Sequence, residues 1–177
     1  MNQAGSLTWE MEVMALQGRK MVVIIIDQQG GPPTGLAAQL TVLGRARALH
    51  IPIWAVLMNP GINAHPPKAT KPQLADLGAV DREFVKPHLS VFDHRTNPNI
   101  RVALEALSIE RIIIMGQQSE QCVKLAAIGG SVDIHDKKFY PGATTFGFGR
   151  AIYSDPARKD PRCSISIARL AGFHIAN

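Results

Sequence analysis

The sequence predicts a single α/β domain in which a mostly parallel central sheet carries helices on both faces, a three-layer α/β/α architecture. The first observation is length, because 177 residues suffice for one domain to build a core without disulfides or metals. The second is a series of short, continuous apolar runs, typical of strands buried on both faces of a parallel sheet. The third is the helical spacing of leucines between these runs, which indicates crossover helices.

Each element is supported by its own residues. In chain order we expect a strand at 21–26, a helix at 36–50, a strand at 53–58, a loop at 59–78, a helix from 97, a strand at 112–115, and helices at 119–128 and 160–170. The strands are apolar runs of four to six residues, rich in Ile and Val. The helices are bounded by residues that cap or break helices, namely Pro52, Asn97, Pro98, Ser119, Gly129 and Asp160.

Residues 1–18 form an extension ahead of the first core strand. Leu7, Trp9, Met11 and Val13 alternate with polar residues, which is the period of a strand with one covered face. We therefore expect the extension to form an edge strand. An apolar edge strand either covers its own core or docks on another subunit, so we also expect a symmetric homo-oligomer.

Composition excludes several classes of function. Apolar residues make up 46% of the chain and charged residues 19%, as in ordinary globular proteins. The net charge is +5, but Lys and Arg are scattered, so we expect no nucleic-acid partner. No apolar run reaches the roughly 20 residues of a membrane span, and residues 1–19 lack the apolar core of a signal peptide. We expect a protein of the cytoplasm with no membrane partner.

The cysteines carry a further expectation about compartment. Cys122 and Cys163 lie far apart and belong to no metal-binding motif, so we expect free thiols in a reducing compartment. Cys163 falls inside the expected last helix, where a structural role is favoured. The glycine-rich segments at 30–35 and 147–149 lack the features of phosphate-binding loops, and we expect no nucleotide cofactor.

Asp27, Lys86 and Cys122 are the candidates for chemistry. Asp27 directly follows the first strand, and Cys122 falls in the first turn of the helix after the strand at 112–115. Ligand sites of parallel sheets form beyond the carboxyl ends of the strands, so we expect all three residues to converge there. The amino-terminal end of a helix and the ammonium group of Lys86 both favour a thiolate at Cys122. The carboxylate of Asp27 can accept the thiol proton, and backbone N–H groups can hold the oxyanion that forms when a carbonyl is attacked.

Three segments resemble motifs of the isochorismatase-like cysteine hydrolases, a family that includes nicotinamidases and N-carbamoylsarcosine amidase. Residues 24–29, IIIDQQ, resemble the family's strand and D-x-Q motif. Residues 86–92, KPHLSVF, are similar to its K-x-x-x-S-A-F segment. Residues 112–123, IIIMGQQSEQCV, resemble its G-x-x-[ST]-[DE]-x-C-V signature, the most specific of the three. The resemblance covers residues 20–128.

This resemblance implies one isochorismatase-like hydrolase domain over residues 1–177, acting on a small amide or related C–N bond. Asp27 would be the base, Cys122 the nucleophile, and Lys86 the group that lowers the pKa of the thiol. The small-molecule substrate itself is not specified. Nicotinamidases of the family carry a D-x-H motif and further histidine ligands before the lysine, whereas residues 59–83 contain one histidine. We therefore expect no metal and no nicotinamidase activity.

The resemblance also implies a non-proline cis peptide between Gln117 and Gln118, which would aim the N–H of Gln118, with that of Cys122, at the oxyanion. Phe92 is implied as a substrate-binding residue. The family usually has small or β-branched residues where this chain has the two glutamines. An alternative is therefore a catalytically impaired family member that serves as a binding or interaction protein.

Overall fold

The computed structural model describes residues 3–28, 36–58, 77–86, 91, 98–116, 122–123, 126, 130–132, 139–141, 151–153 and 174–176. Its helices are α1 (Gln3–Leu16), α2 (Leu36–Ala48) and α4 (Pro98–Ala106). Its strands are β1 (Met21–Ile26), β2 (Ile53–Met58), β3 (Arg82–Lys86), β4 (Arg111–Gly116), β5 (Gly130–Val132), β6 (Phe139–Pro141), β7 (Ala151–Tyr153) and β8 (His174–Ala176).

The main sheet has six strands in the order β3-β2-β1-β4-β7-β8, and every neighbouring pair is parallel. β1 lies in the middle between β2 and β4, while β5 and β6 form a separate antiparallel pair. The strands expected at 21–26, 53–58 and 112–115 are confirmed as β1, β2 and β4. The helices expected at 36–50 and from 97 are confirmed as α2 and α4.

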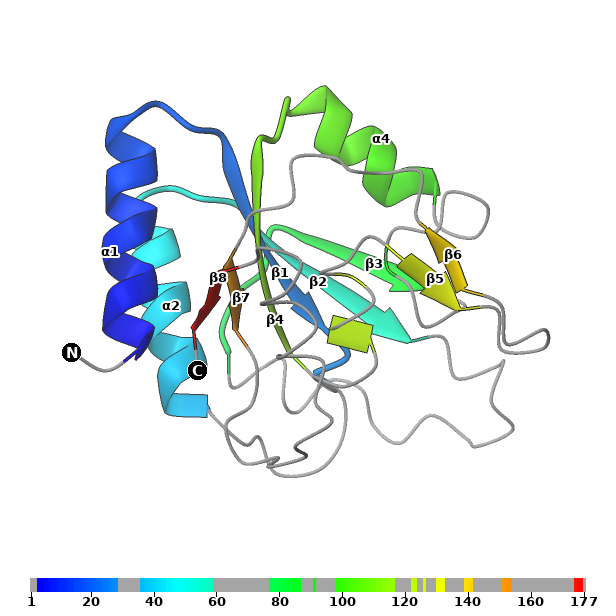
Figure 1. Ribbon diagram of the computed structural model, residues 1–177, viewed down its shortest axis with the longest axis horizontal. Helices are drawn as coiled ribbons and strands as arrows, with labels where there is room; N and C mark the ends of the chain where they lie inside the picture. Colours follow the sequence, from blue (N-terminus) through cyan, green and yellow to red (C-terminus); the bar gives the residue numbers. More distant parts are fainter. Residues whose placement is uncertain are drawn as a thin grey trace.

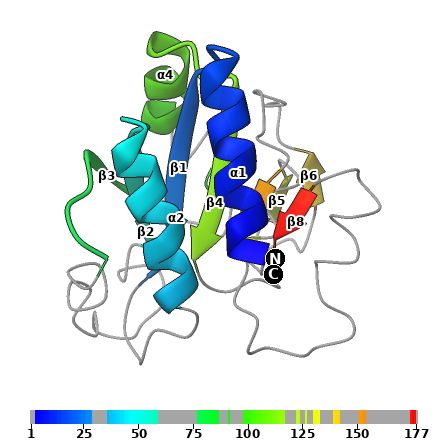
Figure 2. The ribbon, with the colours of Figure 1, turned by 90° about the vertical axis from the view of Figure 1, so that its left-hand side faces the viewer.

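Helices cover both faces of the sheet, which confirms the three-layer α/β/α architecture. α1 and α2 pack side by side on one face, and α4 lies on the other (Figures 1 and 2). In Figure 1, the arrows of β1 and β2 point downward, away from α4 at the top. The carboxyl ends of the parallel strands therefore share one edge, as the site requires.

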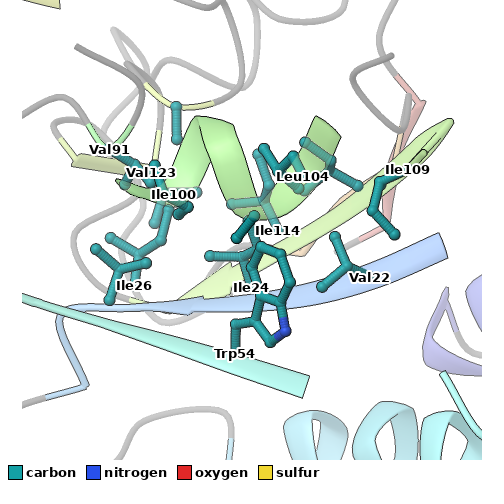
Figure 3. Close-up of a cluster of buried hydrophobic side chains, with 14 of the residues drawn as sticks. Val22, Ile24, Ile26, Trp54, Val91, Ile100, Leu104, Ile109, Ile114 and Val123 are labelled. Carbon is teal, nitrogen blue, oxygen red and sulfur yellow. The ribbon is translucent and has the colours of Figure 1, made fainter. Parts of the chain in front are cut away.

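The two faces of β1 divide its side chains between two cores. Val22, Ile24 and Ile26 pack in the cluster under α4, where Figure 3 shows them beside Trp54 and Leu104. The alternate residues of β1 pack against α1 and α2. Because both faces are covered, no position of β1 tolerates a polar side chain, and each fully buried aliphatic side chain stabilises the fold by about 1.5–3 kcal/mol. This explains the unbroken apolar run in the sequence.

The prediction of an edge strand in residues 1–18 is wrong, because α1 occupies Gln3–Leu16. Leu7 and Met11 are fully buried against the sheet, whereas Trp9 is 61% exposed on the opposite side of the helix. A spacing of four residues satisfies both a strand's alternation and one face of a helix, so a short alternating stretch does not distinguish them. The burial of Leu7 and Met11 in the core makes α1 an integral part of the fold.

Helices α1, α2 and α4 end in the same way, with a residue in the left-handed region followed by a hydrogen bond back over the last turn. The φ angles are +70° for Gly18, +53° for His50 and +52° for Ser108. The N–H of Ile51, for example, donates to the carbonyl oxygen of Ala46 at 2.9 Å. Glycine is the usual residue at this position, since any Cβ strains the conformation.

Several elements were not expected from the sequence. β3 has the burial pattern of an edge strand whose first residues are exposed, so it carries no continuous apolar run. β5 to β8 have three residues each, too short for a periodic pattern. The helix expected at 160–170, most of the loop at 59–78 and the glycine segments lie outside the described residues. Of the helix expected at 119–128, Cys122, Val123 and Ala126 are described, and they are helical.

Candidate active site

The carboxyl ends of the strands hold the candidate residues. Asp27 follows the last residue of β1, and Lys86 is the last residue of β3. Strand pairing aligns Met58 of β2 with Lys86, and Ile26 of β1 with Gly116 of β4. Parallel strands thus bring positions far apart in sequence to one edge, which confirms the expected placement.

Asp27, Lys86 and Cys122 come into direct contact at this edge. The Nζ of Lys86 lies 2.8 Å from Oδ2 of Asp27 and donates a hydrogen bond to Sγ of Cys122 at 3.3 Å. The side chain of Lys86 is fully buried, and that of Asp27 is 13% exposed. The ammonium group therefore lies between a carboxylate and a sulfur, shielded from water, where charges interact far more strongly than at a surface.

Local backbone geometry shapes this edge. Asp27 has a φ of +48°, an uncommon left-handed conformation for a residue other than glycine, although aspartate tolerates it better than most. Gly116 has a φ of +129°, and a Cβ there would collide with the backbone of Ile26. Only glycine permits this approach of β4 to β1. The turn of the chain at Asp27 and the close approach at Gly116 set where the side chains of the site point.

Burial dominates the electrostatics of the site. It raises the pKa of the Asp27 carboxyl above its ordinary value, although the nearby charge of Lys86 and hydrogen bonds from Cys122, Lys86 and the backbone of Met58 act in the opposite direction. Burial and the negative charge of Asp27 raise the pKa of the Cys122 thiol from 9.0 to about 12, against the opposing effect of Lys86. Both effects favour the neutral thiol of Cys122 over the thiolate.

This corrects one expectation from the sequence. A helix terminus and an ammonium group were expected to favour a thiolate at Cys122, and Lys86 does act in that direction. The carboxylate on the other side of the lysine opposes it, and loss of water from the site penalises any charge on sulfur. Sequence spacing identifies the three residues, but it does not give the pKa of the thiol, because the opposing effects of Lys86 and Asp27 depend on burial.

Gln28 was not singled out from the sequence, yet it is fully buried beside Asp27, and both polar atoms of its amide lack a hydrogen-bond partner among the described residues. Within the same part of the chain, Oδ1 of Asp27 is likewise buried without a partner. Buried polar groups are nearly always paired, so these atoms mark the end of β1 as a place with unused hydrogen-bonding capacity. Only burial in the folded chain reveals this feature.

Other predicted site residues fall elsewhere. Phe92, Gln117 and Gln118, with the cis peptide implied between the two glutamines, lie outside the described residues and stay predictions. Among the described residues, no group of three or more His, Cys, Asp or Glu side chains is placed to hold a metal ion. In that same part of the chain, no helix has the length and apolar character needed to cross a membrane.

Comparison with known proteins supports the fold. No protein-family model matches the sequence, and no curated protein sequence matches it. Solved structures do resemble it. A pyrazinamidase/nicotinamidase from Streptococcus mutans UA159 gives a TM-score of 0.59 at 16% identity, covering 88% of this chain and 99% of that one. YcaC from Pseudomonas aeruginosa, with hexane-2,5-diol and covalent acrylamide, gives 0.60 at 16% identity, covering 89% and 76%.

A third solved structure, the octameric YcaC gene product from Escherichia coli, described as a hydrolase of unknown specificity, gives a TM-score of 0.58 at 17% identity. It covers 89% of this chain and 75% of that one. An isochorismatase-like hydrolase from Alkaliphilus metalliredigens gives 0.58 at 16% identity, covering 89% and 93%. The chain therefore has the isochorismatase-like α/β fold. The resemblance found in the sequence motifs is confirmed at the level of the fold.

Proposed function

We propose that this chain is a cysteine-dependent hydrolase of the isochorismatase-like family, acting on a small amide or a related C–N bond. The observation that carries the proposal is the buried contact of Lys86 with both Asp27 and Cys122, at 2.8 and 3.3 Å. These residues come from segments separated by 59 and 36 positions. A buried lysine is rarely retained without a partner, and the carboxylate of Asp27 and the thiol of Cys122 both suit nucleophilic catalysis.

Lys86 keeps the charge of the site balanced during activation of the nucleophile. The proposed resting state has a negative Asp27, a positive Lys86 and a neutral Cys122 thiol. When the thiol proton moves to Asp27, the negative charge passes from oxygen to sulfur, and both atoms lie within 3.3 Å of the same ammonium group. The net charge of the trio stays zero throughout. Proton transfer therefore requires no change of charge in a site shielded from water.

The reaction follows from this arrangement. The sulfur of Cys122 attacks the substrate carbonyl carbon, and the carbonyl oxygen becomes an oxyanion that the backbone N–H groups of Gln118 and Cys122 would hold. Asp27 gives its proton to the leaving nitrogen, the C–N bond breaks, and an acylated Cys122 remains. A water molecule, deprotonated by Asp27, attacks that thioester. The C–S bond breaks, the acid leaves, and Asp27 returns its proton to the sulfur of Cys122, which restores the thiol. Asp27 thus acts as base and then acid in each half of the reaction.

The raised pKa of the thiol fits this role for Asp27. A thiol with a pKa of about 12 does not ionise at neutral pH on its own, so its reactivity depends on a base in contact with it. Activity should fall as the pH falls through the raised pKa of Asp27, because the protonated acid cannot accept the thiol proton. The alternative, a binding protein without turnover, predicts no hydrolysis at any pH.

A substrate screen tests the proposal. Purified protein is assayed against small amides and ureas, with the variants Cys122→Ala and Asp27→Asn and with Cys163→Ala as the matched control. We expect Cys122→Ala to abolish hydrolysis, Asp27→Asn to lower the rate at least 100-fold at every pH, and Cys163→Ala to retain it. Hydrolysis should survive EDTA. Turnover by Cys122→Ala would refute the mechanism, and loss with EDTA would reveal a metal.

Covalent labelling gives a second readout that needs no known substrate. Acrylamide, which is covalently bound in the Pseudomonas aeruginosa YcaC structure, alkylates thiolates and is itself a small amide. We expect mass spectrometry to find the adduct on Cys122, formed more slowly in Asp27→Asn. Because the resting thiol is neutral, Asp27 and not the ordinary ionisation of the thiol should set the rate. Equal labelling in both proteins would favour the binding alternative.

We also propose that the chain forms a homo-oligomer through the outer face of α1. Trp9 is 61% and Leu16 89% exposed, and seven residues on a helix return to the same face. Large apolar side chains gathered on one exposed face are typical of interaction surfaces. The octameric assembly of the Escherichia coli structure supports association in this fold. We retain the cytoplasm as the proposed location.

A further inference from the structure

A cavity of about 530 Å³ opens at the opposite edge of the sheet from Asp27 and Lys86. It lies where β2 and β3 begin and where α2 and the segment after α4 end, and its lining includes Arg47, His50, Trp54, Asp81, Arg82 and Leu107. Arg82 and Lys86 are four residues apart on β3, so the cavity is roughly 13 Å from the candidate active site. Its volume falls within the range of small-molecule sites.

Positive charge in this cavity is not neutralised. Within the part of the chain that the structure describes, neither Arg47 nor Arg82 forms an ion pair. The guanidinium of Arg82 lies over the ring of Trp54, 5.7 Å from its centroid, and no side chain or backbone group of the described residues hydrogen-bonds to its N–H groups. Two guanidinium groups and one carboxylate give the cavity a net charge of +1.

The carboxylate in the cavity is already engaged. Oδ2 of Asp81 accepts a hydrogen bond from the backbone N–H of Ile53 at 2.7 Å, and the N–H of Asp81 donates to the carbonyl oxygen of Ile53 at 2.7 Å. These bonds fix Asp81 against the start of β2. It therefore anchors the backbone of the loop before β3, and the forked donors of Arg82 stay open to a ligand.

Arg47 is held in place by the chain on the other wall. Its Nη2 donates to the carbonyl oxygens of Leu77 at 2.6 Å and Ala79 at 3.2 Å. A Cβ on Gly78, whose φ is +81°, would lie 2.9 Å from the same nitrogen, so glycine permits this approach. Carbonyl oxygens satisfy Nη2 without cancelling the charge of the guanidinium. Arg47 thus presents a fixed positive charge to the cavity.

We propose that this cavity binds a small phosphate monoester. Arg82 is the principal ligand of the phosphate group, and Arg47 supplies a fixed second charge. The organic part of the ester packs against an apolar wall formed by Ile51, Pro52 and Leu107. Guanidinium groups match phosphate oxygens in pairs, which makes an unpaired arginine in a cavity suited to this chemistry. The site is separate from the proposed catalytic residues and does not depend on the proposed function.

Trp54 provides a direct readout. The chain contains two tryptophans, and Trp9 is exposed, so Trp9→Phe leaves Trp54 beside the cavity as the single reporter. In this background, the fluorescence of the full chain is titrated with sodium phosphate and with phenyl phosphate at constant ionic strength. We expect saturable binding with a dissociation constant in the millimolar range for phosphate, and at least threefold tighter binding of phenyl phosphate through the apolar wall.

Arginine variants decide the assignment. Arg82→Gln should weaken phosphate binding at least tenfold, and Arg82→Lys, which keeps the charge but loses the fork, should weaken it severalfold. Arg45→Gln is the matched control, because it removes the same charge as Arg82→Gln but at a residue of α2 that does not line the cavity. It should leave binding unchanged. Binding by Arg82→Gln within threefold of the parent, or an equal response to chloride, would overturn the site. Equal affinity for the two phosphates would overturn the role of the apolar wall.

Discussion

Replacing Lys86 with methionine should destabilise the fold severely. Lys86 is fully buried, with its ammonium group 2.8 Å from Oδ2 of Asp27. Methionine fills a similar volume, so packing changes little, but it leaves the carboxylate of Asp27 buried without its cation. Breaking a buried ion pair from one side costs about 3–5 kcal/mol, because the remaining charge stays desolvated.

The chain offers a matched control on its surface. Arg19 and Glu110 form an ion pair at 3.3 Å, with side chains 47% and 42% exposed. Water screens this pair, so Arg19→Met should cost less than about 1 kcal/mol. The double variant Asp27→Asn/Lys86→Met removes both buried charges and should recover at least half of the loss caused by Lys86→Met alone.

Urea denaturation at pH 7 and at mildly acid pH measures these effects. Without Lys86 the pKa of Asp27 rises further, since the charge that opposed the effect of burial is gone. A carboxyl whose pKa is raised in the folded state contributes stability below its unfolded pKa and loses that contribution as the pH rises through the folded pKa. The deficit of Lys86→Met should therefore shrink on acidification. A loss below about 1 kcal/mol, or a double variant no more stable than the single one, would refute the reasoning.

Three further predictions concern other parts of the molecule. The pKa of the Cys122 thiol is raised from 9.0 to about 12, so the thiol contributes stability below pH 9 that is lost as the pH rises toward 12. The variant Cys122→Ala should therefore remove up to about 4 kcal/mol of the alkaline decline in the free energy of unfolding. Parallel declines in both proteins would contradict this. His50→Gly should raise the free energy of unfolding, measured by thermal denaturation, by about 0.5–1 kcal/mol, because the φ of +53° at His50 suits glycine. A loss of stability would show that contacts of the imidazole stabilise the fold by more than the backbone strain costs. Trp9→Lys with Leu16→Lys should reduce the mass measured by light scattering without unfolding the chain, since both side chains face outward, and an unchanged oligomer would place its interface elsewhere.

The central strands could be predicted from the sequence because a strand buried on both faces needs an apolar side chain at every position. β1, β2 and β4 are buried on both faces, which requires a continuous apolar run and produces a signal that no surface element imitates. The helix beginning at Pro98 was equally readable, because asparagine and proline together mark a helix start. With parallel strands inferred, the meeting of Asp27 with Cys122 followed from topology, whereas Lys86 ends β3, a strand that the sequence did not predict.

What only the tertiary structure decided is the environment of each residue. The extension at 1–18 alternates like a strand, but packing of Leu7 and Met11 against the sheet made it α1, since a spacing of four residues fits both periods. A helix terminus and Lys86 were expected to favour a thiolate at Cys122, but the ionisation of the thiol depends on burial and on the distances to two opposite charges, which the folded chain sets. Sequence thus determined which groups meet at the edge of the sheet, and three-dimensional packing determined their protonation, because desolvation exists only once the chain has folded around them.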